Sequence, residues 1–142
     1  MSKKLPPIDG YPIYDPIDPL ETLVGPFFWK EMDDGTQHFV LKVETQHCNR
    51  HEIVHGGLMM TMIDLAMVVA AKEHSEEQLV TVSLNSEFID AGHAGELIEA
   101  SGELIRRTGS MAFVRGKIHE AERTLLSSSA VFKRMRLKTA KQ

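Results

Sequence analysis

The sequence predicts an α+β fold in which one antiparallel sheet of about six strands packs around a single long helix. Three observations lead to this prediction. Residues 56–71 form the longest apolar segment, and they are rich in Met, Leu and Ala, which favour a helix. Two segments before it and four after it are apolar or alternate between apolar and polar residues, as strands do. Strands and helices do not alternate along the chain, which argues against a parallel βαβ architecture.

The first half of the chain divides into an arm and two strands. Residues 1–20 contain five prolines and few periodic apolar positions, so we expect an irregular arm that precedes a single domain of residues 21–142. The apolar, aromatic residues 23–32 predict a first strand, which ends at the turn Asp33-Asp34-Gly35. The segment HFVLKVE predicts a second strand, with Val40 as the one exception to its alternation.

The predicted helix is apolar nearly all round, so it should be buried on most sides. After it, the segment VTVSLNSEFID alternates clearly, and three further strand-like segments follow at residues 96–107, 110–118 and 123–132. The connections between these segments are short enough for hairpins. They predict a meander of four antiparallel strands.

Composition narrows the class of protein. The chain has 142 residues, 42% of them hydrophobic, and a formal net charge of −4, which gives no reason to expect nucleic-acid binding. Its single cysteine, Cys48, cannot form an intrachain disulfide, and this favours a reducing compartment. The apolar run is shorter than the roughly 20 residues of a membrane span and contains Asp64. The N-terminus has no apolar core typical of a signal peptide. We therefore expect a cytoplasmic protein that does not bind membranes.

The stretch HEIVHGG at residues 51–57 allows two interpretations. H-E-x-x-H binds zinc when both histidines share one face of a helix, which would require helix from His51 to His55. Two glycines follow at once, and they are more typical of the start of a helix than of its middle. A chance metal site from the histidines and Cys48 of this region stays open as an alternative. We interpret the stretch as a helix start without a metal.

Asp64 is the only charged residue of the apolar helix. A buried carboxylate needs a partner, a cleft that contains water or a raised pKa. It is therefore either a structural residue that bonds a neighbouring strand or a general base or nucleophile in an acyl-sized pocket. Thr61 lies one turn before it on the same face and is a candidate polar neighbour.

The helix start offers the complementary group. Gly56 and Gly57 let a ligand approach the backbone, whose free N–H groups favour negative charge, as an oxyanion hole requires. Asp64 lies eight residues beyond Gly56, about 12 Å along the helix axis. One chain cannot easily bring both groups to the same carbonyl carbon. A site that uses both should therefore lie between two chains.

Together, Asn49, the sequence VHGG at residues 54–57 and Asp64 resemble the signature of the hotdog-fold thioesterases, specifically the PaaI-like acyl-CoA thioesterase branch. The segments VTVSLNSEFIDAGHAGE and ELIRRTGSMAFVRGKI are similar to strands of the same family, and the resemblance covers about residues 25–134. It departs at Glu52, where family members commonly have glycine. The resemblance implies a hotdog fold, in which an antiparallel sheet wraps around a central helix.

The resemblance also implies roles for individual residues. Asp64 would act as general base or nucleophile, and the Gly56 N–H would donate to the thioester oxygen. Asn49 would orient the attacking water or the carboxylate. His55 would polarise the carbonyl or hold the loop. Substrate contacts would come from the nearby residues Gly57, Thr61, Thr81 and Ser83, among which the family's Ser or Thr beside the carboxylate falls at Thr81 or Ser83.

The expected function is hydrolysis of an acyl-CoA thioester to a free acid and CoA by a homodimer, without metal or cofactor. Pairing of two dimers into a homotetramer stays open. A non-catalytic acyl-CoA sensor with the same fold is the main alternative, and a hotdog dehydratase or hydratase is a third. The presence of Asp64 together with Asn49 and the glycine pair favours the hydrolase.

Overall fold

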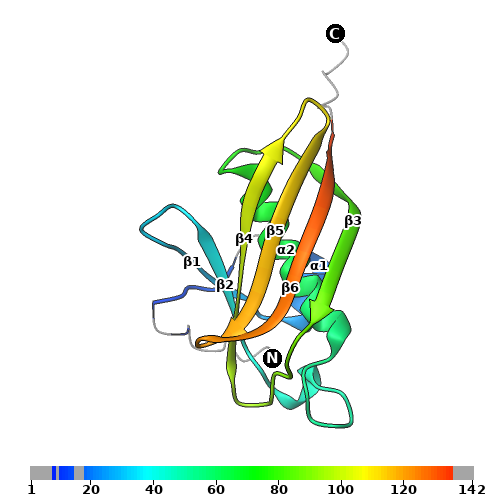
Figure 1. Ribbon diagram of the computed structural model, residues 1–142. Helices are drawn as coiled ribbons and strands as arrows, with labels where there is room; N and C mark the ends of the chain where they lie inside the picture. The colour runs from blue at the N-terminus through cyan, green and yellow to red at the C-terminus, as the bar shows by residue number, and fades with distance from the viewer. Residues whose placement is uncertain (1–7, 9, 15–17, 136–142) are drawn as a thin grey trace.

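The computed structural model describes residue 8, residues 10–14 and residues 18–135, and these residues form an α+β fold (Figure 1). Six strands make one antiparallel sheet in the order β1-β2-β4-β5-β6-β3, and the long helix α2 packs across one face of it. This confirms the predicted hotdog architecture. The elements are α1 (Pro19–Val24), β1 (Phe28–Glu31), β2 (Gln37–Lys42), a 3₁₀ turn η1 (Thr45–His47), α2 (Gly56–Lys72), β3 (Leu79–Phe88), β4 (Leu97–Arg107), β5 (Met111–Glu120) and β6 (Arg123–Arg134). None of the helices among these residues is long and apolar enough to cross a membrane.

The helix α2 is buried on most sides, as its sequence predicts. Its fully covered residues pack against the sheet and are Leu58, Met59, Met62, Ile63, Leu65, Ala66, Met67 and Ala71. A narrow stripe along the opposite side is only half-buried, and it includes Met60, Thr61, Asp64, Val68 and Lys72. Asp64 therefore avoids the cost of full burial, because it belongs to this stripe.

The start of the sheet differs from the prediction. Residues 23–32 do not form one strand, because Leu23 and Val24 belong to the helix α1 and β1 begins only at Phe28. Pro19 is well suited to the first turn of a helix, and the Glu21 carboxylate accepts the backbone N–H of Asp18 at 3.2 Å. These local signals override the apolar pattern. The predicted boundary at residue 20 falls inside α1.

The prediction of a four-strand meander is also wrong in one respect. Only β4, β5 and β6 are joined as a meander, whereas β3 lies at the sheet edge beside β6 and the connection from β3 to β4 is no hairpin. Arg123 fixes this crossover: it donates to the Ala91 carbonyl at 2.7 Å and pairs with Asp90 at 3.1 Å and Glu96 at 2.7 Å. Contacts so distant in sequence leave no trace in local periodicity.

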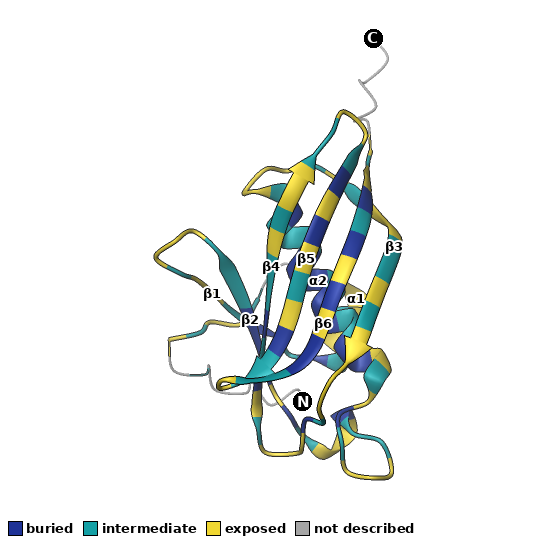
Figure 2. Cartoon of the chain, in the orientation of Figure 1, coloured by how far each residue is buried: buried dark blue, intermediate teal, exposed yellow. Residues whose placement is uncertain are grey.

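Buried and exposed positions alternate along β5 and β6 (Figure 2). We refer to the face of the sheet turned away from α2 as the outer face. Phe28 and Val40, which are directly paired, are buried but do not belong to the core around α2. The Tyr11 hydroxyl donates to Glu99, the β4 partner of Val40, so the described segment of residues 10–14 covers this part of the outer face. That cover explains why Val40 breaks the alternation.

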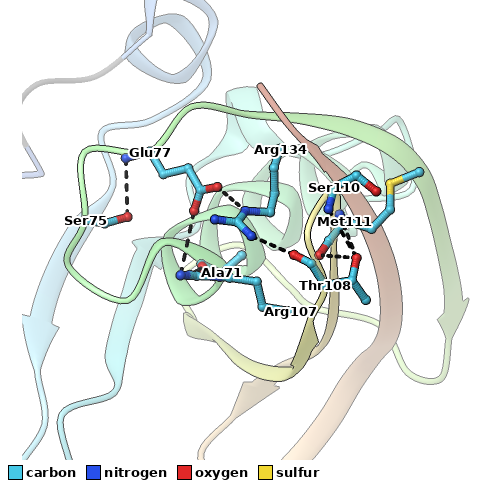
Figure 3. Close-up of polar contacts among 8 residues, drawn as sticks. All are labelled: Ala71, Ser75, Glu77, Arg107, Thr108, Ser110, Met111 and Arg134. Carbon is cyan, nitrogen blue, oxygen red and sulfur yellow. Dashed lines mark hydrogen bonds and ion pairs between the residues drawn. The ribbon is translucent and has the colours of Figure 1, made fainter. Parts of the chain in front are cut away.

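The far end of α2 is tied to the sheet by one polar network (Figure 3). Glu77 pairs with both Arg134 and Arg107, and Arg107 donates to the carbonyl of Ala71 in the last turn of the helix. Arg134 also donates to the Thr108 carbonyl at 2.6 Å. The network fixes the helix that carries Asp64 relative to β4 and β6.

Candidate active site

Asp64 is held by the edge strand β3. The Thr81 hydroxyl donates a hydrogen bond of 2.7 Å to one carboxylate oxygen, Oδ1. The second carboxylate oxygen, Oδ2, has no hydrogen-bond partner among the residues that the structure describes. A carboxylate oriented by one hydroxyl and open on its other side is suited to take a proton from water or to attack a carbonyl carbon.

The structure brings Thr81 and not Ser83 to Asp64. Residues two apart on a strand normally share a face, but a β-bulge lies between these two. Thr81 is paired with the fully buried Phe132, on the side of α2, whereas Ser83 is paired with Val131. The Ser83 hydroxyl accepts from the side-chain amide of Asn85 at 3.1 Å. Ser83 therefore lies on the outer face.

A second carboxylate lies near Asp64 and was missed by the sequence analysis. Burial raises the pKa of the Glu21 carboxyl above its ordinary value, and the negative charge of Asp64 acts in the same direction. Glu21 belongs to α1, which contacts α2. The combination of Asp18, Pro19 and Glu21 is a helix-start signal that could have revealed α1, but its position beside Asp64 is a tertiary contact.

The start of α2 leaves one backbone donor free. The His55 ring accepts the Gly57 N–H through Nδ1 at 2.9 Å, and the His55 carbonyl accepts from Leu58 and Met59 at 3.0 and 3.2 Å. The Gly56 N–H has no acceptor within the described part of the chain. Because Nδ1 of His55 is an acceptor, a neutral ring carries its proton on Nε2.

A side chain at Gly56 would meet the ring of Phe88. A Cβ at this position would lie 3.2 Å from the Phe88 ring, which is 55% exposed. The next residue, Gly57, lines a groove of about 430 Å³ with Thr61 and the α1 residues Leu23 and Val24. The Thr61 hydroxyl donates to the Gly57 carbonyl at 3.1 Å. The groove thus runs from the helix start between α1 and α2.

Asn49 shapes the loop before the helix. Its side-chain oxygen accepts the His51 N–H at 2.8 Å, and its main-chain carbonyl accepts the Glu52 N–H at 3.0 Å. Within the chain the structure does not bring it to Asp64. Glu52 adopts a positive φ of 62°, a conformation that glycine adopts without cost. Glu52 thus adopts the backbone conformation that glycine favours, at the position where the resembling family commonly has glycine.

The helix that H-E-x-x-H would need does not form, because His51 lies in a turn and α2 begins only at Gly56. Two further side chains of this region have partners. His47 is buried, with Nδ1 accepting the Glu44 N–H at 2.9 Å and Nε2 3.2 Å from the Gly25 carbonyl. The Cys48 thiol donates to the Glu44 carbonyl, and burial raises its pKa. His47 therefore anchors the loop to the segment after α1.

Known proteins give the context of this arrangement. The sequence model of the Thioesterase superfamily matches residues 51–127. A relative from Pseudomonas aeruginosa, named "Putative esterase PA0474", is 30% identical over 116 residues, which are 80% of this chain and 87% of that protein. Among solved structures, the BH2602 protein from Bacillus halodurans with CoA is 21% identical with a TM-score of 0.78, over 88% of this chain and 83% of that one. The E. coli PaaI protein from the phenylacetic acid degradation operon is 19% identical with a TM-score of 0.76, over 84% and 86%.

Proposed function

The chain belongs to the thioesterase superfamily and is a thioester hydrolase, and we propose that it cleaves acyl-CoA thioesters to a free acid and CoA through Asp64 and the Gly56 N–H. The observation that carries the proposal is the hydrogen bond that holds Asp64 on the half-buried stripe of α2. Thr81 holds one oxygen of this carboxylate, and Oδ2 has no partner among the described residues, so it is available to accept a proton. The CoA-bound structure of the Bacillus halodurans protein supports acyl-CoA as the substrate class.

In the proposed reaction, water attacks the thioester carbon while Asp64 takes its proton. The carbonyl oxygen becomes an oxyanion, which accepts the Gly56 N–H, and the carbon–sulfur bond then breaks to release CoA. Direct attack by Asp64, followed by hydrolysis of the acyl-enzyme anhydride, needs the same two groups. The His55 Nε2–H is a further donor beside the oxyanion, and Asn49 would orient the water.

We place this site between two chains. The Gly56 N–H and Asp64 lie about 12 Å apart along one rigid helix, too far for both to contact one carbonyl carbon. Beside Asp64, β3 is the edge strand of the sheet formed by the described residues, and it exposes Val80 by 49% and Val82 by 56%. A long, apolar strand edge favours pairing with another chain. A symmetric dimer formed there would bring two sites together.

The first experiment is thiol release from acyl-CoAs of short, medium, long and aromatic acyl groups. Asp64→Asn keeps the shape of the side chain and should lower kcat by at least about 100-fold, because the base is lost. Glu122→Gln, which removes an exposed carboxylate from a turn, should leave kcat unchanged. Turnover should also survive EDTA. Acyl-CoA binding without turnover in the wild type would instead support the sensor alternative.

Gly56 offers a sharp test of the donor. Gly56→Pro removes the N–H but suits the first position of a helix, and His55 already has the extended conformation (φ −60°, ψ 131°) that a following proline requires. Gly56→Ala adds a similar Cβ beside Phe88 and keeps the N–H. Gly56→Pro should lose much more kcat than Gly56→Ala. Equal losses would show that packing and not the N–H matters.

Mixing the two inactive variants tests the shared site. If Asp64 and Gly56 act across the interface, a mixed dimer of Asp64→Asn and Gly56→Pro chains has one intact site. Random reassortment should then restore about one quarter of the wild-type activity. If both groups act within one chain, no mixture contains an intact site, and the activity stays at the level of the variants.

A further inference from the structure

Three potential metal ligands meet on the outer face of the sheet, away from the proposed active site. They are His38 of β2, Glu99 of β4 and His119 of β5, and one ligand atom from each lies within 4.8 Å of the others. All three side chains are half-buried. Within the described part of the chain, no other group of His, Cys, Asp or Glu side chains gathers so closely.

The strand register creates this cluster. Glu99 is directly paired with His119 on one side and with Val40 on the other, and His38 lies two residues before Val40 on the same face. Ala100, the next residue, is fully buried on the side of α2, so Glu99 points to the outer face. Three adjacent strands thus each contribute one ligand.

The hydrogen bonds of the cluster leave ligand atoms available to a cation. The His119 Nδ1 lies 2.8 Å from the Ala121 carbonyl and therefore donates to it, which leaves the Nε2 lone pair free. A histidine that binds a metal typically donates its other N–H in this way. Glu99 accepts from His38 at 2.7 Å and from the Tyr11 hydroxyl at 3.0 Å. Among the described residues, no Lys or Arg forms an ion pair with Glu99.

We propose that His38, Glu99 and His119 bind a divalent transition metal ion, with Zn²⁺ the best match. Two imidazoles, one carboxylate and a water satisfy its tetrahedral preference. Ligands about 2.0–2.1 Å from the metal lie about 3.3 Å apart. To reach this spacing, the ligand atoms close in from separations within 4.8 Å, and His38 Nδ1 moves slightly outward from its 2.7 Å contact with Glu99. The proton of the His38 ring moves from Nδ1 to Nε2, so that the Nδ1 lone pair can bind the metal.

The proposed metal site would stabilise the sheet and would take no part in catalysis. It joins β2, β4 and β5 on the outer face, and Tyr11 connects it to the N-terminal arm through Glu99. Asp64 lies on the opposite face and contacts β3, which β5 and β6 separate from β4. A metal that binds only the folded state stabilises that state by mass action. The bound ion should therefore raise the Tm without changing turnover.

The test is titration of the EDTA-treated, dialysed full-length chain with ZnCl₂, followed by calorimetry, and with CoCl₂, followed by visible absorption. His119→Ala and Glu99→Gln should each weaken Zn²⁺ binding at least tenfold, about the loss that follows even from disturbing groups behind the ligands. Both should abolish the rise in Tm on adding Zn²⁺. Acyl-CoA turnover should remain that of the wild type.

His74→Ala is the matched control, because His74 also bonds a carboxylate, that of Glu31 at 3.0 Å, but forms no three-ligand group with the other described residues. It should leave the Zn²⁺ affinity unchanged. Unchanged affinity in His119→Ala and Glu99→Gln would overturn the proposal. So would a loss of binding in His51→Ala, which would place the metal at the H-E-x-x-H segment.

Discussion

Two glycines set the distance between α2 and the sheet. Gly102 of β4 and Gly116 of β5 are directly paired, and both face the helix. A Cβ at Gly102 would lie 2.9 Å from the Ala66 carbonyl oxygen and 3.0 Å from the Met67 Cα, which are backbone atoms. A Cβ at Gly116 would meet the ends of flexible side chains, Ile63 Cδ1 and Met67 Cγ, both at 2.8 Å.

The same substitution should therefore have different costs at the two positions. Overpacking typically costs about 1–3 kcal/mol, and alanine recovers about 0.5–1 kcal/mol by restricting the unfolded chain. At Gly102 the whole helix must shift, so we expect Gly102→Ala to lower the free energy of unfolding by about 2 kcal/mol or more. At Gly116 the side chains can rotate away, so we expect a loss within about 1 kcal/mol.

Urea unfolding followed by the fluorescence of the single tryptophan, Trp29, measures both variants at one protein concentration. Because Ala66 lies just beyond Asp64 on α2, Gly102→Ala should also reduce acyl-CoA turnover under conditions where it remains folded. Equal losses of stability, or a larger loss in Gly116→Ala, would refute the view that backbone contact at Gly102 sets the helix position.

Two further predictions concern the neighbours of Asp64. Thr81→Val removes the hydroxyl that orients the carboxylate and should lower kcat about tenfold, whereas Thr81→Ser should keep most of it; an unchanged rate in Thr81→Val would contradict the assignment. The pKa of Glu21 is raised in the folded chain, so just above the ordinary value of 4.5 the folded state binds more protons than the unfolded state. The free energy of unfolding should therefore fall as the pH rises through that window. Glu21→Gln should flatten this dependence in urea unfolding between about pH 4 and pH 7, and an unaltered slope would count against it.

The sequence predicted the structure best where a local residue pattern reflects a local environment. The segment of α2 is apolar on most sides because the sheet covers it, and β4, β5 and β6 follow the predicted segments because adjacent strands joined by short turns keep their pairing local. The position of β3 was not predictable in this way. It depends on the contacts of Arg123 with residues about 30 positions earlier, which no local pattern encodes.

The same distinction applies to the candidate site, where some residues could be predicted from the sequence and others could not. Asp64 is conspicuous because it is charged within an apolar helix, and the glycine pair marks the helix start. Whether Thr81 or Ser83 faces Asp64 depends on one β-bulge. The bulge breaks the regular alternation of strand faces on which a prediction from sequence relies. Glu21 was missed because its interaction with Asp64 joins helices more than 40 residues apart in the chain. Packing decides all three of these details.

The proposed division of the site between two chains follows from the helix itself. His55 satisfies the next three N–H groups of the first turn with its ring and its carbonyl, so the Gly56 N–H at the positive end of the helix dipole is left without an acceptor among the described residues. Asp64 lies about two turns further on, and no rearrangement of a rigid helix can bring them together. Its hydroxyl partner, Thr81, lies on β3, the edge strand of the sheet that the described residues form. A second chain that paired with this edge would lie directly beside Asp64, so the contact that completes the sheet would also supply the missing oxyanion donor.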